Sequence, residues 1–174
     1  MSIAPEIPES KAWKYAQTEW ERSFLLPGPP AELGKLPFKE IEDHYLINTQ
    51  IRLRRTFDGK NRQWKLSKKL KLQSQSQQWV STIYLSQREY DLFAQLPAFF
   101  LKKRRYYLKD IDSQHIGIDH IVLAEKELWL AEVEFSSEEK LRAYKLPLAF
   151  LREVSEETGY NGFELARIFS SLSS

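Results

Sequence analysis

Two pairs of glutamates with the same spacing stand far apart in this chain. Glu19 and Glu21 lie two residues apart, and so do Glu132 and Glu134. Residues i and i+2 of a β-strand share one face, so on strands each pair would present two carboxylates in the same direction. Carboxylate oxygens are ligands that Mg²⁺ and Mn²⁺ prefer. The two pairs therefore predict an oxygen-liganded metal site.

Basic residues stand between the two acidic pairs and keep a same-face strand spacing. They are Arg52, Arg54, Lys65, Lys69, Lys103 and Arg105. Acids towards both ends of the chain and bases in the middle, all in step with strand alternation, predict one polar cavity. A divalent metal together with a polyphosphate matches that combination of charges.

The segments that carry these residues are mostly predicted to be strands, because apolar and polar residues alternate along them. Asp58-Gly59 marks a hairpin turn. Ser86 with Glu89 forms a capping box that opens a helix. The predicted strands cover residues 16–26, 38–47, 51–54, 62–72, 80–85, 100–109, 114–123 and 128–135, and further short helices are predicted at 137–144 and 161–170. About eight antiparallel strands with a few short helices favour an α+β chain built on a barrel or a sandwich.

The alternating charges have a second interpretation. Charged residues on strands also mark a solvated outer face, and Lys and Arg protect edge strands from aggregation. The apolar face is predicted to be supplied by Trp64, Leu66, Leu128, Leu130 and Phe24. If the charged face instead lines a closed barrel, each buried unpaired cation costs several kcal/mol. The cavity hypothesis therefore requires a polyanion, a metal ion or water inside it.

Composition narrows the class of protein. The chain has 174 residues, which favours a single domain, with residues 1–13 as a flexible lead-in and 14–174 as the folded part. A formal net charge of +2 argues against a nucleic-acid partner. The absence of cysteine excludes disulfides and thiolate metal sites. No signal segment or membrane-spanning run is present, so we expect a cytoplasmic protein without a membrane or an obligate protein partner.

Several short blocks resemble the CYTH family, the triphosphate tunnel metalloenzymes. The family's opening motif, Glu-x-Glu-x-Lys or Arg followed by Phe-Leu, is similar to residues 19–25 here. Further blocks follow in the family's order, so that the resemblance covers about residues 14–168. These blocks are Ile51-Arg52-Leu53-Arg54, Leu66-Ser67-Lys68-Lys69, Lys103-Arg104-Arg105-Tyr106, Ile118-Asp119 and Ala131-Glu132-Val133-Glu134.

The resemblance implies an eight-stranded antiparallel β-tunnel that hydrolyses a triphosphate with Mg²⁺ or Mn²⁺. Inorganic triphosphate is the expected substrate. By position, metal would be held by Glu19, Glu21, Glu132 and Glu134. Phosphate oxygens would be bound by Arg52, Arg54, Lys65, Lys69, Lys103 and Arg105. Glu19, Glu21 and Asp119 would be the catalytic acids, with Asp119 orienting basic groups or water.

Two departures from the family pattern leave a binding function open. Ser23 stands where the motif has Lys or Arg, which removes one cation. The central strand normally supplies acids, but residues 77–81 contain none. The alternative prediction is therefore a weak or inactive module that binds a polyphosphate or a nucleotide.

A competing motif lies near the C-terminal end. Residues 152–160, Arg-Glu-Val-Ser-Glu-Glu-Thr-Gly-Tyr, resemble the core of a Nudix box, in which acids on a helix bind Mg²⁺. The full pattern requires a glycine and a glutamate where this chain has Glu138 and Tyr144, and Pro147 interrupts the span. A charged connection into the last helix is the preferred interpretation.

Overall fold

The protein is described by a computed structural model over residues 14–71, 76–109, 115–123, 126–145 and 152–172. The predicted lead-in at 1–13 lies outside these residues. Eight long strands run along the chain: β1 (Gln17–Leu25), β2 (Phe38–Leu46), β3 (Ile51–Phe57), β4 (Arg62–Lys71), β5 (Gln77–Leu85), β6 (Ala98–Lys109), β7 (His115–Leu123) and β8 (Lys126–Phe135). The two-residue strand β9 (Arg152–Glu153) adds to β1.

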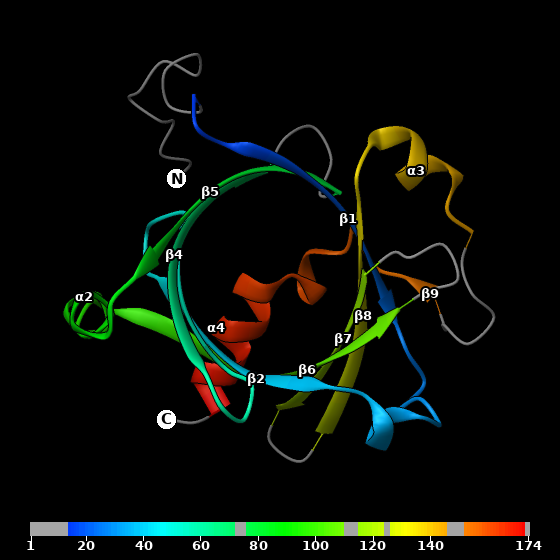
Figure 1. The fold of residues 1–174 in the computed structure, drawn as a ribbon, viewed down its shortest axis with the longest axis horizontal. Coiled ribbons are helices and arrows are strands. Elements are labelled where there is room, and N and C mark those ends of the chain that lie inside the picture. Colours follow the sequence, from blue (N-terminus) through cyan, green and yellow to red (C-terminus); the bar gives the residue numbers. More distant parts are fainter. Residues whose placement is uncertain (1–13, 72–75, 110–114, 124–125, 146–151, 173–174) are drawn as a thin grey trace.

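The eight long strands form a closed antiparallel barrel (Figure 1). Their order is β5-β4-β3-β2-β6-β7-β8-β1, and β1 closes the ring by pairing with β5 as well as β8. Closure removes the exposed edges that an open sheet would present. The predicted eight-stranded barrel is therefore confirmed, and the sandwich is not formed.

Three helices accompany the barrel in the described residues: α2 (Gln87–Phe93), α3 (Glu138–Ala143) and α4 (Gly162–Leu172). The capping box predicted at Ser86 and Glu89 is confirmed, because each side chain bonds the backbone N–H of the other residue. The hairpin at Asp58-Gly59 is also confirmed. Gly59 has φ of +92°, and the Asp58 carboxylate accepts hydrogen bonds from the N–H groups of Lys60 and Asn61.

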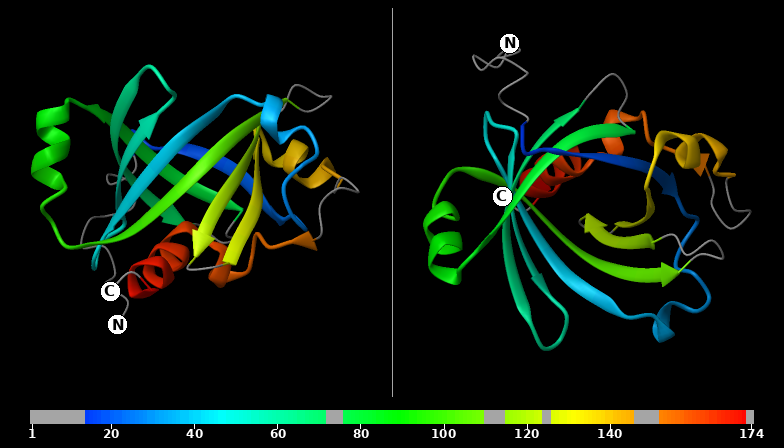
Figure 2. Two further views of the ribbon diagram at one scale, coloured as in Figure 1. Left: turned by 90° about the horizontal axis from the view of Figure 1, so that it is seen from below. Right: turned by 45° about the horizontal axis from the view of Figure 1, so that its top comes forward.

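Apolar residues form one cluster outside the barrel and another inside it. The outer cluster joins β1, β6, β7 and β8 through Phe24, Tyr106, Ile118 and Val133, and Leu141 of α3 packs against it. The inner cluster packs α4 against the barrel strands. It consists of Leu101, Ile121, Leu130, Val154, Leu165 and Ala166. In Figure 1 α4 lies within the outline of the ring. Figure 2 shows that it lies at one end of the barrel.

The inner cluster corrects the prediction for β8. Leu128 and Leu130 were expected on an apolar face opposite the charged one, but by strand alternation they share the face of Glu132 and Glu134. Leu130 packs with the α4 residue Leu165 inside the barrel. The reason is that α4 buries its own apolar residues against the strands at its end of the barrel. The charged residues line the rest of the interior.

Candidate active site

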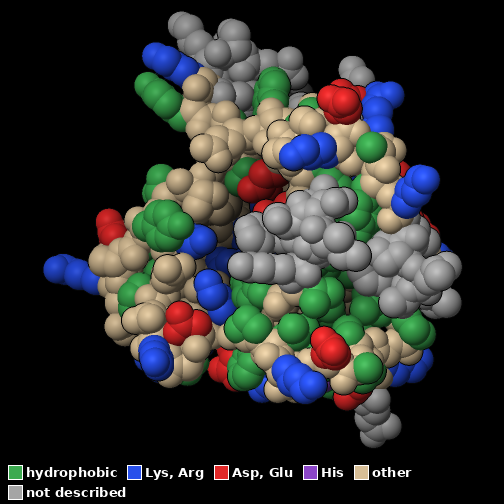
Figure 3. Space-filling view, turned by 45° about the vertical axis from the view of Figure 1, so that its right-hand side comes forward, with side chains coloured by type: hydrophobic (Ala, Val, Ile, Leu, Met, Phe, Trp, Pro, Cys, Tyr) green, Lys and Arg blue, Asp and Glu red, His purple; other side chains and the backbone are tan. Residues whose placement is uncertain are grey.

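The barrel encloses a cavity of about 600 Å³. All predicted site residues except Asp119 line it, and they come from β1, β3, β4, β6 and β8. Figure 3 shows the hollow from outside, with acidic and basic side chains at its edges. The charged face therefore points inward, and the alternative of a solvated outer face does not hold for these residues.

Strand pairing explains how the two glutamate pairs meet. In the β1–β8 register, Glu21 lies opposite Glu134, and Ser23 lies opposite Glu132. Alternation turns Glu19, Glu21 and Ser23 inward and turns Phe24 into the outer apolar cluster. Two segments more than a hundred residues apart thus form one acidic wall.

Glu21 is the acid of this wall whose pKa is raised. Burial raises its pKa to about 7, and the negative charge of Glu132 adds to that effect, while Lys69 and Arg105 oppose it. Burial also opposes ionisation of Glu132, but Arg105 and Lys103 hold the pKa of Glu132 well below its usual range. Glu132 is therefore paired with two cations, whereas Glu21 has no described ion pair.

Asp119 lies behind the cavity and holds two of its cations. Its carboxylate accepts hydrogen bonds from Arg105 at 2.6 and 2.7 Å and from Lys103 at 2.5 Å. Both cations also pair with Glu132. Gly117 makes room for this arrangement, since a Cβ there would lie 3.0 Å from Cδ of Arg105. Asp119 therefore contacts the lining cations rather than the cavity, and the orienting role stays a prediction.

A second buried carboxylate, Asp43 of β2, was missed by the sequence analysis. Arg54 donates two hydrogen bonds to it, at 2.6 and 2.7 Å, and Nε of Arg52 lies 3.8 Å from it. The signal was present, because Ile41, Asp43 and Tyr45 alternate along a predicted strand. Glu40 and Glu42 obscured it, since the sequence does not say which acids face inward.

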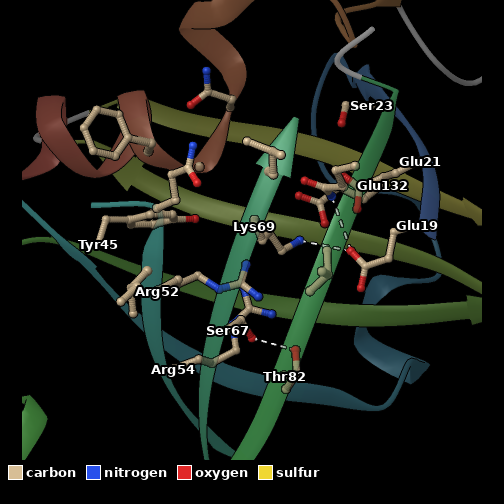
Figure 4. Close-up of a pocket in the computed structure, with 18 of the residues that line it drawn as sticks. Glu19, Glu21, Ser23, Tyr45, Arg52, Arg54, Ser67, Lys69, Thr82 and Glu132 are labelled. Carbon is tan, nitrogen blue, oxygen red and sulfur yellow. Dashed lines mark hydrogen bonds and ion pairs between the residues drawn. The ribbon is translucent and has the colours of Figure 1, made fainter. Parts of the chain in front are cut away.

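Lys69 bridges the acidic and basic sides of the cavity. Its ammonium donates a hydrogen bond to Glu19 at 3.2 Å (Figure 4). The Gln78 amide donates to the same oxygen at 3.3 Å. Burial lowers the pKa of Lys69, and Arg52 lowers it further, while Glu21 and Glu19 oppose this. Lys65 lines the cavity with its ammonium 4.9 Å from the Tyr84 ring centroid.

These pairings give the cavity an electrical polarity. Lys103 and Arg105 are balanced by Asp119 and Glu132, and Lys69 is balanced by Glu19. On the β3–β4 side, Asp43 is the only described acid that pairs with Arg52 and Arg54. Among the described residues, no acid forms an ion pair with Lys65. On the β1–β8 side, no described ion pair involves Glu21 or Glu134. An anion would therefore lie towards β3 and β4, and a cation towards β1 and β8.

The acidic wall offers carboxylate oxygens, the donor atoms that Mg²⁺ and Mn²⁺ prefer. Every acidic side chain lining the cavity is a glutamate, and two of them, Glu21 and Glu134, take part in no described ion pair. Among the described residues, no three acidic or histidine side chains converge closely enough to hold an ion unaided. The wall therefore fits an ion that takes further ligands from water and phosphate oxygens, as Mg²⁺ commonly does.

The end of the cavity next to α4 is uncharged and was not predicted. Its lining includes Tyr45, Gln50, Tyr160, Asn161 and Phe163. Tyr45 and Phe163 pack edge to face with ring centroids 6.1 Å apart. Gly162 accommodates the Tyr45 hydroxyl, which a Cβ at that position would meet at 2.0 Å. The sequence did not predict that these residues line the cavity, because such residue types are common in cores and loops.

The Nudix-like segment has another structure. Arg152 and Glu153 form β9, and no helix begins in the described residues from 152 to 161 except a single 3₁₀ turn, Thr158–Tyr160. Glu153 pairs with Arg22 on the outer side, while Ser155 bonds the Ser23 backbone and lines the cavity. The acids of this segment therefore do not lie on a helix, and the segment forms part of the cavity wall.

Solved structures with the same architecture identify the fold. The inorganic triphosphatase NE1496 is 28% identical, with a TM-score of 0.57 over 85% of this chain and 93% of that chain. The chain has the CYTH, or triphosphate tunnel, fold. Two Pyrococcus horikoshii OT3 proteins, PH1819 and PH1012, share it at 16% and 15% identity, with TM-scores of 0.53 and 0.52. The alignments cover 71% of this chain and 82% and 83% of those chains. No protein-family profile and no curated protein sequence matches the chain.

Within the described parts of the CYTH barrel, each helix is too short or too polar to span a lipid bilayer.

Ser23 gives a direct test of the missing cation. It lines the cavity opposite Glu132, so Ser23→Lys would place an ammonium inside the barrel. We expect triphosphate affinity or turnover to rise about 3–10-fold, equivalent to roughly 0.7–1.4 kcal/mol. Calorimetry and phosphate release would measure it. The control is Thr18→Lys, which adds the same charge to an exposed position of β1. If both variants behave like the unmodified protein, Ser23 does not limit the site.

Proposed function

We propose that this protein is a metal-dependent phosphohydrolase that cleaves the terminal phosphoanhydride of a triphosphate, with inorganic triphosphate as the foremost substrate. The observation that carries the proposal is the cavity's polarity, with uncompensated acids on one wall and an excess of bases on the other. The similarity to the inorganic triphosphatase NE1496 supports the choice of substrate.

The basic residues of the cavity have two roles in such a reaction. Arg52 and Arg54 offer forked N–H groups to phosphate oxygens, and Lys65 and Lys69 offer point charges. Lys103 and Arg105, held by Asp119, stabilise charge that develops on the leaving diphosphate.

The acidic wall orients the other reactant. Glu19, Glu21, Glu132 and Glu134 would hold Mg²⁺ or Mn²⁺, which when bound supplies Lewis-acid polarisation of phosphate and acidification of water. Glu19 and Glu21 orient the attacking water towards the terminal phosphorus. Water adds to that phosphorus, the bond to the bridging oxygen breaks, and the products are phosphate and diphosphate.

The alternative, a module that binds polyphosphate or a nucleotide without turnover, rests on one observation. The β5 residues that line the cavity are Gln78, Val80 and Thr82, none of which is an acid, and Ser23 adds no cation. The cavity would then lack an acid from β5 and a cation at Ser23 for catalysis. The basic side could still bind a polyanion.

A phosphate-release assay separates the two functions. Inorganic triphosphate, diphosphate, ATP and thiamine triphosphate would each be tested with Mg²⁺, with Mn²⁺ and with EDTA. We expect metal-dependent turnover that is fastest with inorganic triphosphate. Binding without turnover of any compound would support the module, and absence of both binding and turnover would contradict the two functions together.

A further inference from the structure

Asp43 is a carboxylate that the proposed reaction does not use directly. It is 0% exposed on the inner side of β2 and does not line the cavity, which places it behind the arginines of β3. Burial opposes its ionisation, but Arg54 and Arg52 hold the pKa of Asp43 well below its usual range. A charged group buried this completely is retained only where its partners are well fixed.

The contacts of Asp43 are specific. Strand register sets it directly opposite Arg54, and their bidentate bond uses Nε and Nη2 of the guanidinium. Arg54 also lines the cavity, and no described residue accepts a hydrogen bond from its Nη1. Arg52, two residues earlier on the same face of β3, has a buried Nε with no hydrogen-bond partner among the described residues, 3.8 Å from Asp43. Asp43 is thus the anion between two neighbouring cations of like charge.

The geometry points to Asp43 as a positioning residue that holds Arg52 and Arg54 in the orientation that binds phosphate oxygens. This role rests on the proposed function, because it presupposes a phosphate ligand in the cavity. Without the carboxylate, the two guanidinium groups would repel each other, and Arg54 would lose both bonds that orient its plane.

Asp119 provides a comparison on the opposite side of the barrel. It also lies directly opposite the arginine that it holds, Arg105. That group is balanced by a second acid, Glu132, whereas the β3 group has Asp43 alone among the described acids. Loss of Asp43 therefore leaves the arginines of the more positive wall without a described acidic partner.

Asp43→Asn distinguishes positioning from simple charge, because the two explanations predict opposite signs. Removing a negative charge near the site would tighten binding of an anion if only net charge mattered. Positioning predicts that the affinity for inorganic triphosphate falls about 10–100-fold, since a misplaced guanidinium no longer meets its phosphate oxygen. Titration calorimetry with inorganic triphosphate in EDTA measures this without depending on turnover.

Glu42→Gln is the matched control. Glu42 is the neighbouring acid of β2, faces the other side of the strand and pairs with Arg55 and His44. This variant also removes an ion-paired acid from β2, yet its triphosphate affinity should stay within about twofold of the unmodified protein. An equal loss of affinity in Asp43→Asn and Glu42→Gln would assign the effect to a general loosening of β2 and overturn the positioning role.

Two further variants decide the remaining cases. On an Arg54→Met background, Asp43→Asn should cost much less affinity than it does alone, because the residue it positions is absent. If Asp43→Asn does not fold, Asp43→Glu retains the charge but moves it by one methylene. Positioning predicts weaker binding for that variant, and unchanged binding would overturn it. Binding without turnover in the unmodified protein would reject the hydrolase while leaving the role of Asp43 testable.

Discussion

Glu21→Gln is expected to lower metal-dependent triphosphate turnover by about 10²–10⁴-fold. Glu21 faces the cavity opposite Glu134 and beside Glu132, on the wall that carries the uncompensated negative charge. Glutamine keeps the shape of the side chain but provides no charged oxygen to hold the metal or to orient the attacking water. Phosphate release from inorganic triphosphate with Mg²⁺ and with Mn²⁺ measures the loss.

The control for this variant is Glu40→Gln on β2. Glu40 is more than half exposed and pairs with Arg104 at 3.5 Å on the outer surface, so its loss should leave turnover unchanged. Circular dichroism should show that both variants are folded. If Glu21→Gln turns over substrate at the unmodified rate, Glu21 is not part of the active site, and the acidic wall needs another explanation.

The same substitution should stabilise the metal-free protein at neutral and alkaline pH. The pKa of Glu21 is raised from 4.5 to about 7 by burial and by Glu132. The folded state therefore binds this proton more tightly than the unfolded state. Its contribution to stability is fully present below about pH 4.5 and is lost as the pH rises through about 7. Because Gln does not titrate, the variant avoids this loss, which amounts to about 1–3 kcal/mol.

Thermal unfolding in EDTA at pH 5 and pH 8 measures this effect. The difference in Tm between Glu21→Gln and the unmodified protein should be more favourable to the variant at pH 8 by roughly 2–10 °C. Glu40→Gln should show no comparable change between the two pH values. Parallel pH profiles for Glu21→Gln and the unmodified protein would mean that ionised Glu21 is tolerated without cost. A variant that loses activity and gains stability would show that the buried charge of Glu21 destabilises the fold and is needed for function.

Most of the barrel could be predicted from local pattern. The alternation in segments such as Ile51-Arg52-Leu53-Arg54 predicted strands, and the pairing of Ser86 with Glu89 predicted the start of α2. Both features depend on residues close in sequence. Closure of the ring does not, because β1 meets β5 through pairs such as Gln17 with Val80. The resemblance to the CYTH family, rather than the pattern, supplied the closed tunnel.

The site was predictable where charge and alternation coincided. Residues such as Glu21, Arg54 and Lys69 stand on regular strands with one polar face, and the structure turns them inward. Asp43 was missed because adjacent acids made both faces of β2 polar, and Leu130 was misplaced because α4 makes part of the interior apolar. Both errors arise from packing between distant elements. The catalytic and binding roles of the lining residues stay predictions.

A thermal-shift titration with inorganic triphosphate tests most directly whether the opposed charged walls form a polyanion site. At a ligand concentration about a hundred times Kd, binding stabilises the fold by about 2.7 kcal/mol. For a domain of this size we expect Tm to rise by roughly 5–10 °C, and to rise much less when Arg52 and Arg54 are both replaced by Met. A flat titration of the unmodified protein, or an equal rise in the doubly substituted variant, would contradict a triphosphate site inside the barrel.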